Sequence, residues 1–596
     1  MSGSYEYAFT KEITEIPTTL SLASFFEEVS PMNEKFPTAL QGPDTIGNQV
    51  LWKAAGYSDD DMSRPLIGIA NSFSDMVAGH TMFREIAQMV KYGVYRAGGT
   101  PAEFGTIACC DGIADAHAGG NYVLPSRDNI ADSVEIMARA HRLDGLVLLG
   151  SCDKIVPGML MAAARLDIPT IFVPGGCMIS GPAFGNQPKT DSTTVSEAMG
   201  KYHTGEIALD EVFRIGHLCT PSCGSCQFMG TANSMCCLAE SLGITLTGSA
   251  LIPAVYNERL RSALKSGEQI VELVKNGISA RQIINQKSLE NAAMTMMAVG
   301  GSTNTVIHSC AIAHERGIDT SSIMEAFDKY SDIIPLIAKI NPATHTYDAV
   351  DLYQAGGIPE VMKIIQPFLN TEVMTVTGKT LGENLDGFKN LYPENPDLIR
   401  TLENPHSTLG GLAIMRGNLA PDTAVAKPAA IHPDVLRFTG KAICFDSEDD
   451  CVEAIEAGSV KVGHVVVIRY EGPKGGPGMR ELYKPMKMLS GQGLARSTAI
   501  ITDGRFSGTN NGCFVGHISP EAAAGGPLAL VKNGDEITID VVNKALTIHV
   551  SDDELLRRRK QWFYEPRPGI GGYLARYASM VTSANQGGVL SISQTL

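Results

Sequence analysis

The sequence lacks several features that would place the protein in common functional classes. No stretch of its 596 residues reaches the roughly 18 consecutive apolar residues of a membrane span. Its formal net charge of −16 is opposite in sign to the basic surface that binds nucleic acids or anionic membranes. Residues 1–20 carry three glutamates and no apolar core segment, unlike a secretory signal or a basic transit peptide. We therefore expect a cytoplasmic protein with a small-molecule partner and no nucleic-acid or membrane partner.

Sequence motifs of hydrolases and nucleotide-binding proteins are also missing. There is no Gly-x-Ser-x-Gly elbow, and His314-Glu315 lacks the second histidine of a zinc-protease motif. The glycine-rich stretch 472–478 lacks the Walker pattern. These absences disfavour a hydrolase triad, a zinc protease and a phosphate cradle.

The composition and the order of apolar runs predict a large α/β protein. A hydrophobic fraction of 44%, a charged fraction of 19% and 61 glycines are typical of a globular enzyme with many tight turns. The length exceeds what one core usually serves. Strand-like runs alternate with helical patterns, which predicts a mostly parallel sheet with functional loops at the strand carboxyl ends. We expect strands at 66–70, 105–108, 145–149 and 170–173, and helices at 82–97, 129–142 and 159–166.

The second half of the chain has a different pattern. Residues 205–375 are mainly helical, and the polar, proline-bearing stretch 378–404 resembles a linker. After it, short strand-like runs separated by glycine turns predict a β-barrel or a sandwich. Such runs lie at 465–469, 499–502, 536–541 and 545–550. We therefore predict an N-terminal α/β domain over residues 1–385 and a C-terminal β domain over residues 386–596.

Cysteines stand where two of the predicted strands end. Cys109-Cys110-Asp111 follows one strand and Cys152-Asp153-Lys154 follows another, while Cys223 and Cys226 form a Cys-x-x-Cys pair. Thiolates suit iron or an iron-sulfur cluster, and carboxylates suit magnesium or manganese. Thiolates from separate loops favour a cluster cradle, although a closed structural zinc site is an alternative. The remaining cysteines other than Cys219 are interpreted as small buried hydrophobes: Cys177, Cys236, Cys237, Cys310, Cys444, Cys451 and Cys513.

Three carboxylates and one hydroxyl complete the candidate site. Asp111, Asp153 and Glu471 each lie in a glycine-rich loop, where backbone can approach a ligand and oxygen donors can bind a hard divalent ion. Each of them taken alone also suits a turn or a helix cap. Ser507 follows an apolar run on a tight turn, where a hydroxyl is either presented to a pocket or simply forms the turn.

Several of these segments together resemble one enzyme family. The chain is similar to the dihydroxy-acid dehydratases and phosphogluconate dehydratases, in family order from about residue 40 to the C-terminus. The matching segments are 111–114, 124–127, 152–159, 223–226 with 231–233, 300–304, 469–478 and 503–508.

The resemblance implies a fold, cofactors and roles for individual residues. It implies an N-terminal α/β domain, a C-terminal β-barrel like the swivelling domain of aconitase-like enzymes, a site between them, and a homodimer or dimer of dimers. It also implies an iron-sulfur cluster and Mg²⁺. The implied residues are Cys152 and Cys226 for the cluster, Asp111, Lys154 and Glu471 for magnesium with Asp153 beside it, Ser507 as base with Thr509 nearby, and Ser126 and Arg127 for substrate. Lys154 is carbamylated in this interpretation, which would turn it into an oxygen ligand.

One departure from the family pattern concerns the third cluster ligand. Relatives with a 2Fe-2S cluster carry a cysteine where this chain has Gly79. Cys110, directly before Asp111, matches the phosphogluconate dehydratase pattern, so we prefer it and keep Cys223 in reserve. This arrangement is similar to the 4Fe-4S branch and leaves one iron open, with 2Fe-2S as the alternative.

The resemblance implies a hydro-lyase that converts a 2,3-dihydroxy acid to a 2-keto acid. Segments 469–478 and 573–585 favour 2,3-dihydroxyisovalerate and its one-carbon-longer homologue, in branched-chain amino-acid biosynthesis. Cys110, Asp115 and Asn510-Asn511 instead suit aldonic acids such as gluconate, xylonate or arabinonate. A hypothesis of another class is a non-catalytic binding protein stabilised by zinc.

Overall fold

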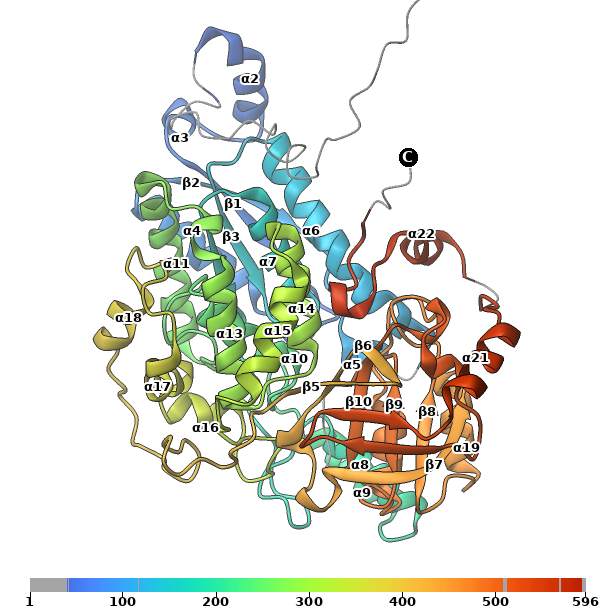
Figure 1. Ribbon diagram of the computed structural model, residues 1–596. Helices are drawn as coiled ribbons and strands as arrows, with labels where there is room; N and C mark the ends of the chain where they lie inside the picture. The colour runs from blue at the N-terminus through green and yellow to red at the C-terminus, as the bar shows by residue number, and fades with distance from the viewer. Residues whose placement is uncertain (1–39, 41, 116, 507–511, 568–569, 592–596) are drawn as a thin grey trace, which may run out of the picture.

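The computed structural model describes residues 40, 42–115, 117–506, 512–567 and 570–591. A helical part built on a parallel sheet stands beside a β-barrel, as the blue-to-yellow and orange-to-red regions of Figure 1 show. The predicted combination of an α/β region and a C-terminal barrel is confirmed.

The N-terminal sheet has four parallel strands in the order β2-β1-β3-β4. They span Leu66–Asn71 (β1), Thr100–Gly105 (β2), Gly145–Gly150 (β3) and Thr170–Pro174 (β4). Every residue of β1 and β3 is buried, as expected for central strands covered on both faces. The strand predicted at 105–108 was misplaced, because β2 ends at Gly105. Pro101 hid it from the pattern, and the edge position of β2 tolerates that proline.

Helices cover this sheet in two closely packed pairs. Helix α4 (Phe83–Arg96) packs against α11 (Asn257–Asn276), and α6 (Val123–Ala140) packs against α7 (Ile155–Leu166). A Cβ atom on Gly93 would lie 2.0 Å from the Leu264 carbonyl oxygen, and one on Gly158 would lie 2.7 Å from the Arg127 carbonyl oxygen. The close helix contacts therefore depend on glycine at these two positions.

The other N-terminal helices extend the core away from the sheet. Their bounds are Ile46–Ala54 (α2), Asp59–Met62 (α3), Asp111–Ala114 (α5), Thr194–His203 (α8), Leu209–Leu218 (α9), Thr231–Ser241 (α10), Ala280–Ile283 (α12), Gln286–Val299 (α13), Asn304–Arg316 (α14), Thr320–Ser331 (α15), Ala349–Gln354 (α16), Gly357–Ile364 (α17) and Leu381–Gly387 (α18). Helix α18 lies within the stretch interpreted as a linker, and its capping box of Thr380 and Glu383 was the missed signal. The division at residues 385 and 386 stays a prediction and falls inside this helix.

The C-terminal part is a closed eight-stranded barrel in the order β10-β6-β5-β12-β11-β7-β8-β9. Its strands are Ala413–Gly417 (β5), Ala420–Ala426 (β6), Arg437–Phe445 (β7), His464–Ile468 (β8), Ala499–Thr502 (β9), Cys513–Ser519 (β10), Glu536–Asp540 (β11) and Ala545–Ile548 (β12). Helices Glu448–Glu456 (α19), Tyr483–Gly491 (α20), Asp552–Gln561 (α21) and Gly572–Met580 (α22) flank it. Closure leaves no unpaired sheet edge, which decides between the barrel and the sandwich.

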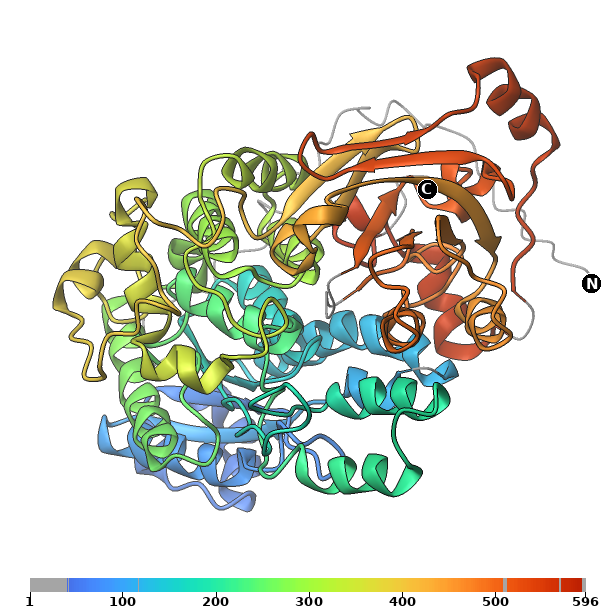
Figure 2. The ribbon, with the colours of Figure 1, turned by 90° about the horizontal axis from the view of Figure 1, so that it is seen from below.

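Contacts at several places hold the barrel against the helical part, beside which it lies in Figure 2. Helices α8 and α20 meet at Gly200 and Gly491, where a Cβ on either glycine would lie 2.5 Å from the Cα of the other. The Lys487 ammonium there lies 2.6 Å from the Glu197 carboxylate. On another side, the segment after α22 returns to the N-terminal helices. The loops between these contacts bring the candidate site residues together.

Candidate active site

The N-terminal site residues lie at the carboxyl ends of parallel strands. Asp111 begins α5 shortly after β2, and Asp153 and Lys154 lie between β3 and α7. Residues at this edge of an open α/β sheet converge on one crevice. The sequence-based placement of these residues at strand ends is therefore reflected in the structure.

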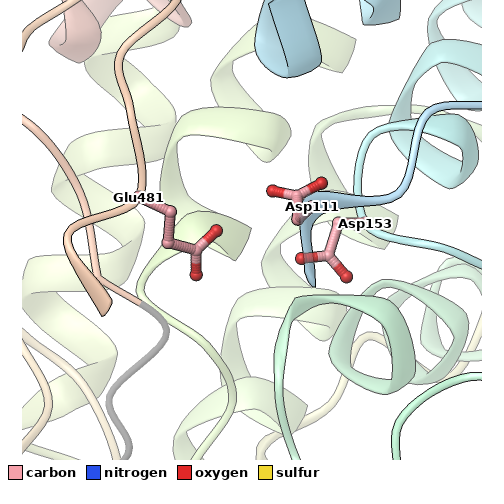
Figure 3. A group of neighbouring side chains, drawn as sticks. All are labelled: Asp111, Asp153 and Glu481. Atoms are coloured by element: carbon pink, nitrogen blue, oxygen red, sulfur yellow. The ribbon is translucent and has the colours of Figure 1, made fainter. Parts of the chain in front are cut away.

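Three carboxylates, the site carboxylates, meet at this edge: Asp111, Asp153 and Glu481. Their ligand oxygens all lie within 4.8 Å of one another. In Figure 3 Glu481 approaches from the opposite side to the two aspartates, on the segment between β8 and α20 of the barrel part. The Lys154 Nζ lies 2.7 Å from Asp111, 3.6 Å from Asp153 and 3.8 Å from Glu481. The group is thus completed only when the two parts of the molecule come together.

Arg505 is a second buried cation in the group, one that the sequence analysis did not identify. Its Nη2 donates to the Asp111 carboxylate at 3.1 Å, and its Nη1 pairs with Glu481. Arg505 belongs to the family-like segment 503–508, which is the signal in the sequence for this residue. When all three carboxylates are ionised, the two cations leave the group with one negative charge in excess, three minus two, and this excess favours a bound cation.

Burial and the neighbouring charges set the pKa values of these carboxyls. Burial raises the pKa of Asp153 to about 6, and the nearby Asp111 charge adds to the effect. Burial also raises the pKa of Glu481 to about 8. Burial acts in the same direction on Asp111, but Lys154 and Arg505 outweigh it and hold the pKa of Asp111 below its ordinary value. The three carboxyls therefore differ strongly in how readily they ionise.

The site fits a hard divalent cation. Asp111 Oδ1 and Glu481 Oε1 are buried, and neither has a hydrogen-bond partner within the described part of the chain. A buried oxygen without a partner is costly unless something binds it. Carboxylate oxygens converging on one point are the donor set that Mg²⁺ uses in proteins.

The structure places Glu471 outside this group. Its buried carboxylate accepts hydrogen bonds from the Glu448 backbone N–H at 2.8 Å and from Arg567 Nη2 at 2.8 Å. Glu481, later in the same loop, takes the place predicted for Glu471. Gly478 explains why this loop can approach the N-terminal part so closely. Its φ is +98°, and an added Cβ atom would lie 1.8 Å from the Asn121 carbonyl oxygen. That close approach carries Glu481 to the N-terminal strand ends.

Three of the predicted cluster thiols are near enough to affect one another's pKa. Burial raises the pKa of Cys152 well above its ordinary value, and the Cys110 and Cys226 thiols raise it further. Burial likewise raises the pKa of Cys226, with Cys110 again contributing. Cys223 is half-buried, as Cys110 and Cys226 are, and it is not among the main causes of the raised pKa of Cys152 or Cys226. Thiols from three separate loops fit an iron-sulfur cluster with three protein ligands.

Gly79 lies against this group of thiols. A Cβ atom there would lie 2.7 Å from Cys152 Sγ. A cysteine at this position would therefore place its thiol beside Cys152, which matches the departure from the family pattern at this residue. With glycine at residue 79, the third thiol near Cys152 and Cys226 is Cys110.

The remaining predicted residues have other contacts or lie outside the described residues. Ser126 Oγ donates to the Val123 carbonyl at 2.7 Å. Arg127 is fully buried and donates to the Gly587 and Gly588 carbonyls at 2.9 and 2.8 Å, so it ties the C-terminal segment to α6. Substrate binding by Ser126 and Arg127 stays a prediction. Ser507 and Thr509 lie outside the described residues.

The fold and the site define a two-part enzyme, with a buried polar site where strand ends of an α/β region meet loops of a barrel. Comparison of the sequence with known proteins identifies the family. Residues 64–384 match the model of the dihydroxy-acid/6-phosphogluconate dehydratase N-terminal region, and residues 397–588 match that of the C-terminal region. The chain belongs to this family, and it is a hydro-lyase.

Individual relatives are similar over nearly their whole length. A dihydroxy-acid dehydratase of Acetivibrio thermocellus is 48% identical over 553 residues, covering 92% of this chain and 98% of the relative. Dihydroxy-acid dehydratases of Caldanaerobacter subterraneus and Pyrococcus furiosus are each 48% identical over 552 residues, with the same coverage. Among the described residues, no helix is long and apolar enough to cross a membrane.

Proposed function

We propose that the protein removes water from a 2,3-dihydroxy carboxylic acid to give a 2-keto acid, with 2,3-dihydroxyisovalerate as the favoured substrate. The observation that carries the proposal is the site itself. Half-buried carboxylates lie around Lys154, two of their oxygens have no partner among the described residues, and three thiols affect one another's pKa beside them. The relatives named dihydroxy-acid dehydratase support the choice of substrate class.

The residues that would hold the cofactors follow from these contacts. Asp111, Asp153 and Glu481 would hold Mg²⁺, together with Lys154 if it is carbamylated. Cys110, Cys152 and Cys226 would hold the iron-sulfur cluster, 4Fe-4S rather than 2Fe-2S, with Cys223 in reserve. When bound, the cation supplies a Lewis acid for the carboxylate and 2-hydroxyl, and the cluster supplies an open iron for the departing 3-hydroxyl.

The protein residues would bind the acid and move one proton. Arg505 supplies positive charge to a buried site, where charge interactions are strong. Ser507 would take the proton from C2, while the hydroxyl leaves C3 and the enol product tautomerises to the 2-keto acid. A serine hydroxyl is a weak base at its ordinary pKa, so it needs nearby positive charge, and Arg505 lies two residues before it.

A second substrate class is favoured by Asp115. Its charge contributes to the raised pKa of Glu448 on the barrel side, so this carboxylate lies where the two parts of the molecule meet. Extra polar groups there suit the additional hydroxyls of an aldonic acid.

Anaerobic reconstitution followed by a 2-keto-acid assay tests the function. The panel contains dihydroxyisovalerate, its one-carbon-longer homologue, gluconate, xylonate and arabinonate. We expect turnover of the branched-chain acids, whereas turnover of aldonates alone would establish the second candidate. A protein that binds zinc and no iron, without turnover of any acid, would be a binding protein instead.

The cluster assignment is tested by a matched pair of cysteine variants. Cys110→Ser is expected to lose most of its iron and its visible absorption after reconstitution, because it removes one of three converging thiols. Cys223→Ser, the control from the Cys-x-x-Cys pair, is expected to keep both. The opposite pattern of iron content would make Cys223 the third ligand.

We also propose that the enzyme works in the cytoplasm as a homodimer or dimer of dimers. The net charge of −16 and the absence of a membrane-length helix among the described residues support the first part. Light scattering of the purified protein measures the assembly directly.

A further inference from the structure

A buried histidine beside the site has no assigned role. His517 lies in β10 and is 2% exposed, yet neither Nδ1 nor Nε2 has a hydrogen-bond partner in the described part of the chain. A buried polar group without a partner costs about 1–3 kcal/mol. Both nitrogens of one ring lack a partner among these residues, which leaves a donor and an acceptor available to a ligand.

The backbone at His517 has an uncommon conformation. Its φ is +56°, and the pairing of β10 with β6 is irregular between Gly516 and Ser519. The His517 N–H donates to the Gly504 carbonyl at 2.8 Å, which fixes it against the residue before Arg505. Strained backbone of this kind persists where surrounding contacts impose it, and it is common at ligand sites.

Burial keeps the His517 ring neutral. Burial lowers its pKa to about 3, and the Arg505 and Lys154 charges act in the same direction. A neutral imidazole offers one N–H donor and one acceptor nitrogen. His308 is close enough for the two rings to affect each other, and its Nδ1 lies 3.1 Å from Arg127 Nη1.

We propose that His517 contacts the substrate and hydrogen-bonds to one of its hydroxyl groups. The inference rests on the proposed function, which supplies a substrate with two adjacent hydroxyls. A hydroxyl both donates and accepts, which matches a neutral imidazole. A carboxylate accepts only, and it is better served by the Arg505 guanidinium, which donates only. His517 is then a specificity-determining residue on the barrel side of the site.

The stability of the cofactor-free protein gives a first test that does not depend on activity. His517→Leu removes two nitrogens that have no partner among the described residues, so we expect a melting temperature no lower than that of wild type, because no hydrogen bond is lost and the cost of the orphaned nitrogens is removed. His80→Leu is the matched control. His80 is equally buried, but its Nδ1 lies 2.9 Å from Ser72 Oγ and its Nε2 accepts from the Cys152 N–H at 3.1 Å. That control is expected to melt clearly lower. A His517→Leu protein that melts as low as the control would overturn the inference, because the ring would then be a structural element.

Substrate recognition gives the second test, in the reconstituted enzyme. With the branched-chain dihydroxy acid, His517→Leu is expected to lose roughly 10- to 100-fold in kcat/KM while keeping the wild-type iron and magnesium content. His517→Gln, which retains a donor and an acceptor, should recover part of this loss.

Competitive inhibitors identify the contacted group. Wild type should bind a 2-hydroxy acid or a 3-hydroxy acid more tightly than the unhydroxylated acid of the same skeleton, and His517→Leu should lose that preference for one of the two. Unchanged preference for both would overturn the inference. Failure of wild type to dehydrate any dihydroxy acid would instead refute the proposed function, and the two failures are therefore distinguishable.

Discussion

Two sets of carboxylates, one half-buried and one fully buried, differ in what binds them. The site carboxylates Asp111, Asp153 and Glu481 face Lys154 and Arg505, and two of their oxygens have no partner among the described residues. A second set, the loop-bracing carboxylates, comprises Glu471, Asp503 and Glu521, and backbone N–H groups bind all of them.

Asp503 shows how complete the binding of this second set is. Its carboxylate accepts from the N–H groups of Glu471 at 2.9 Å, Tyr470 at 3.2 Å and Ala522 at 3.0 Å. It therefore connects three points of the barrel loops. Buried carboxylates bound in this way hold loops in place, whereas buried carboxylates with free oxygens and nearby cations are available to a ligand.

The largest expected effect separates the two glutamates of one loop. Glu481→Gln is expected to lower kcat/KM by roughly 1,000-fold and to reduce magnesium content, because it removes a charged ligand oxygen at the reacting centre. Glu471→Gln is the matched control and should change kcat/KM less than about 10-fold once the folded fraction is counted. Kinetics and metal analysis on both variants check this. Magnesium loss in Glu471→Gln and not in Glu481→Gln would restore the original sequence assignment.

A moderate effect is expected for Asp503→Asn. The amide can accept at only one of the two oxygen positions and brings a donor to the other, so the variant should lose about 1–3 kcal/mol of stability. Thermal and denaturant unfolding measure the change. The folded variant should keep most of its turnover. Full stability combined with loss of turnover would mean that Asp503 takes part in the reaction, and the two sets of carboxylates would then not differ in function.

The smallest expected effect is a pH dependence of stability in the cofactor-free protein. Burial raises the pKa of Asp503 to about 7, above the ordinary value of 3.8, so the folded protein holds this proton to higher pH than the unfolded chain does. The stability that this proton contributes is complete below about pH 4 and is lost as the pH rises through 7. The melting temperature should therefore fall between pH 5 and pH 8, and less steeply in Asp503→Asn. An equally steep fall in the variant would assign the dependence to other buried carboxyls.

The two loops that follow strands of the N-terminal sheet show how much of the site could be predicted from sequence. Asp111, Cys152 and Lys154 follow apolar runs that form β-structure for local reasons, and parallel strands bring their carboxyl ends to one edge. The order of strands and loops in the sequence was therefore enough to predict where these three residues lie. The predicted β2 was misplaced only because Pro101 interrupted its pattern, and this did not move Asp111 away from the strand end.

The sequence did not predict three residues at or beside the site, which are Glu481, Arg505 and His517. All three come from the barrel side, and their contacts are with residues hundreds of positions earlier in the chain or on neighbouring strands. Glu471 and Glu481 stand in the same glycine-rich loop, and nothing local says which one crosses to the N-terminal part. Gly478, packed against the Asn121 carbonyl, makes that selection, and only tertiary structure reveals the contact.

The sequence by itself determined the α/β region, the barrel strands, the family and the loops that carry the thiols and aspartates, because these depend on local patterns and on adjacent residues. Tertiary structure decided which carboxylates remain open to a ligand and which are bound by backbone, because hydrogen-bond satisfaction depends on groups far apart in the chain. It also turned Arg127 toward the C-terminal segment and left the His517 ring without a partner among the described residues. Burial makes these differences important for the free energy, because an unpaired polar group is costly only where water is excluded.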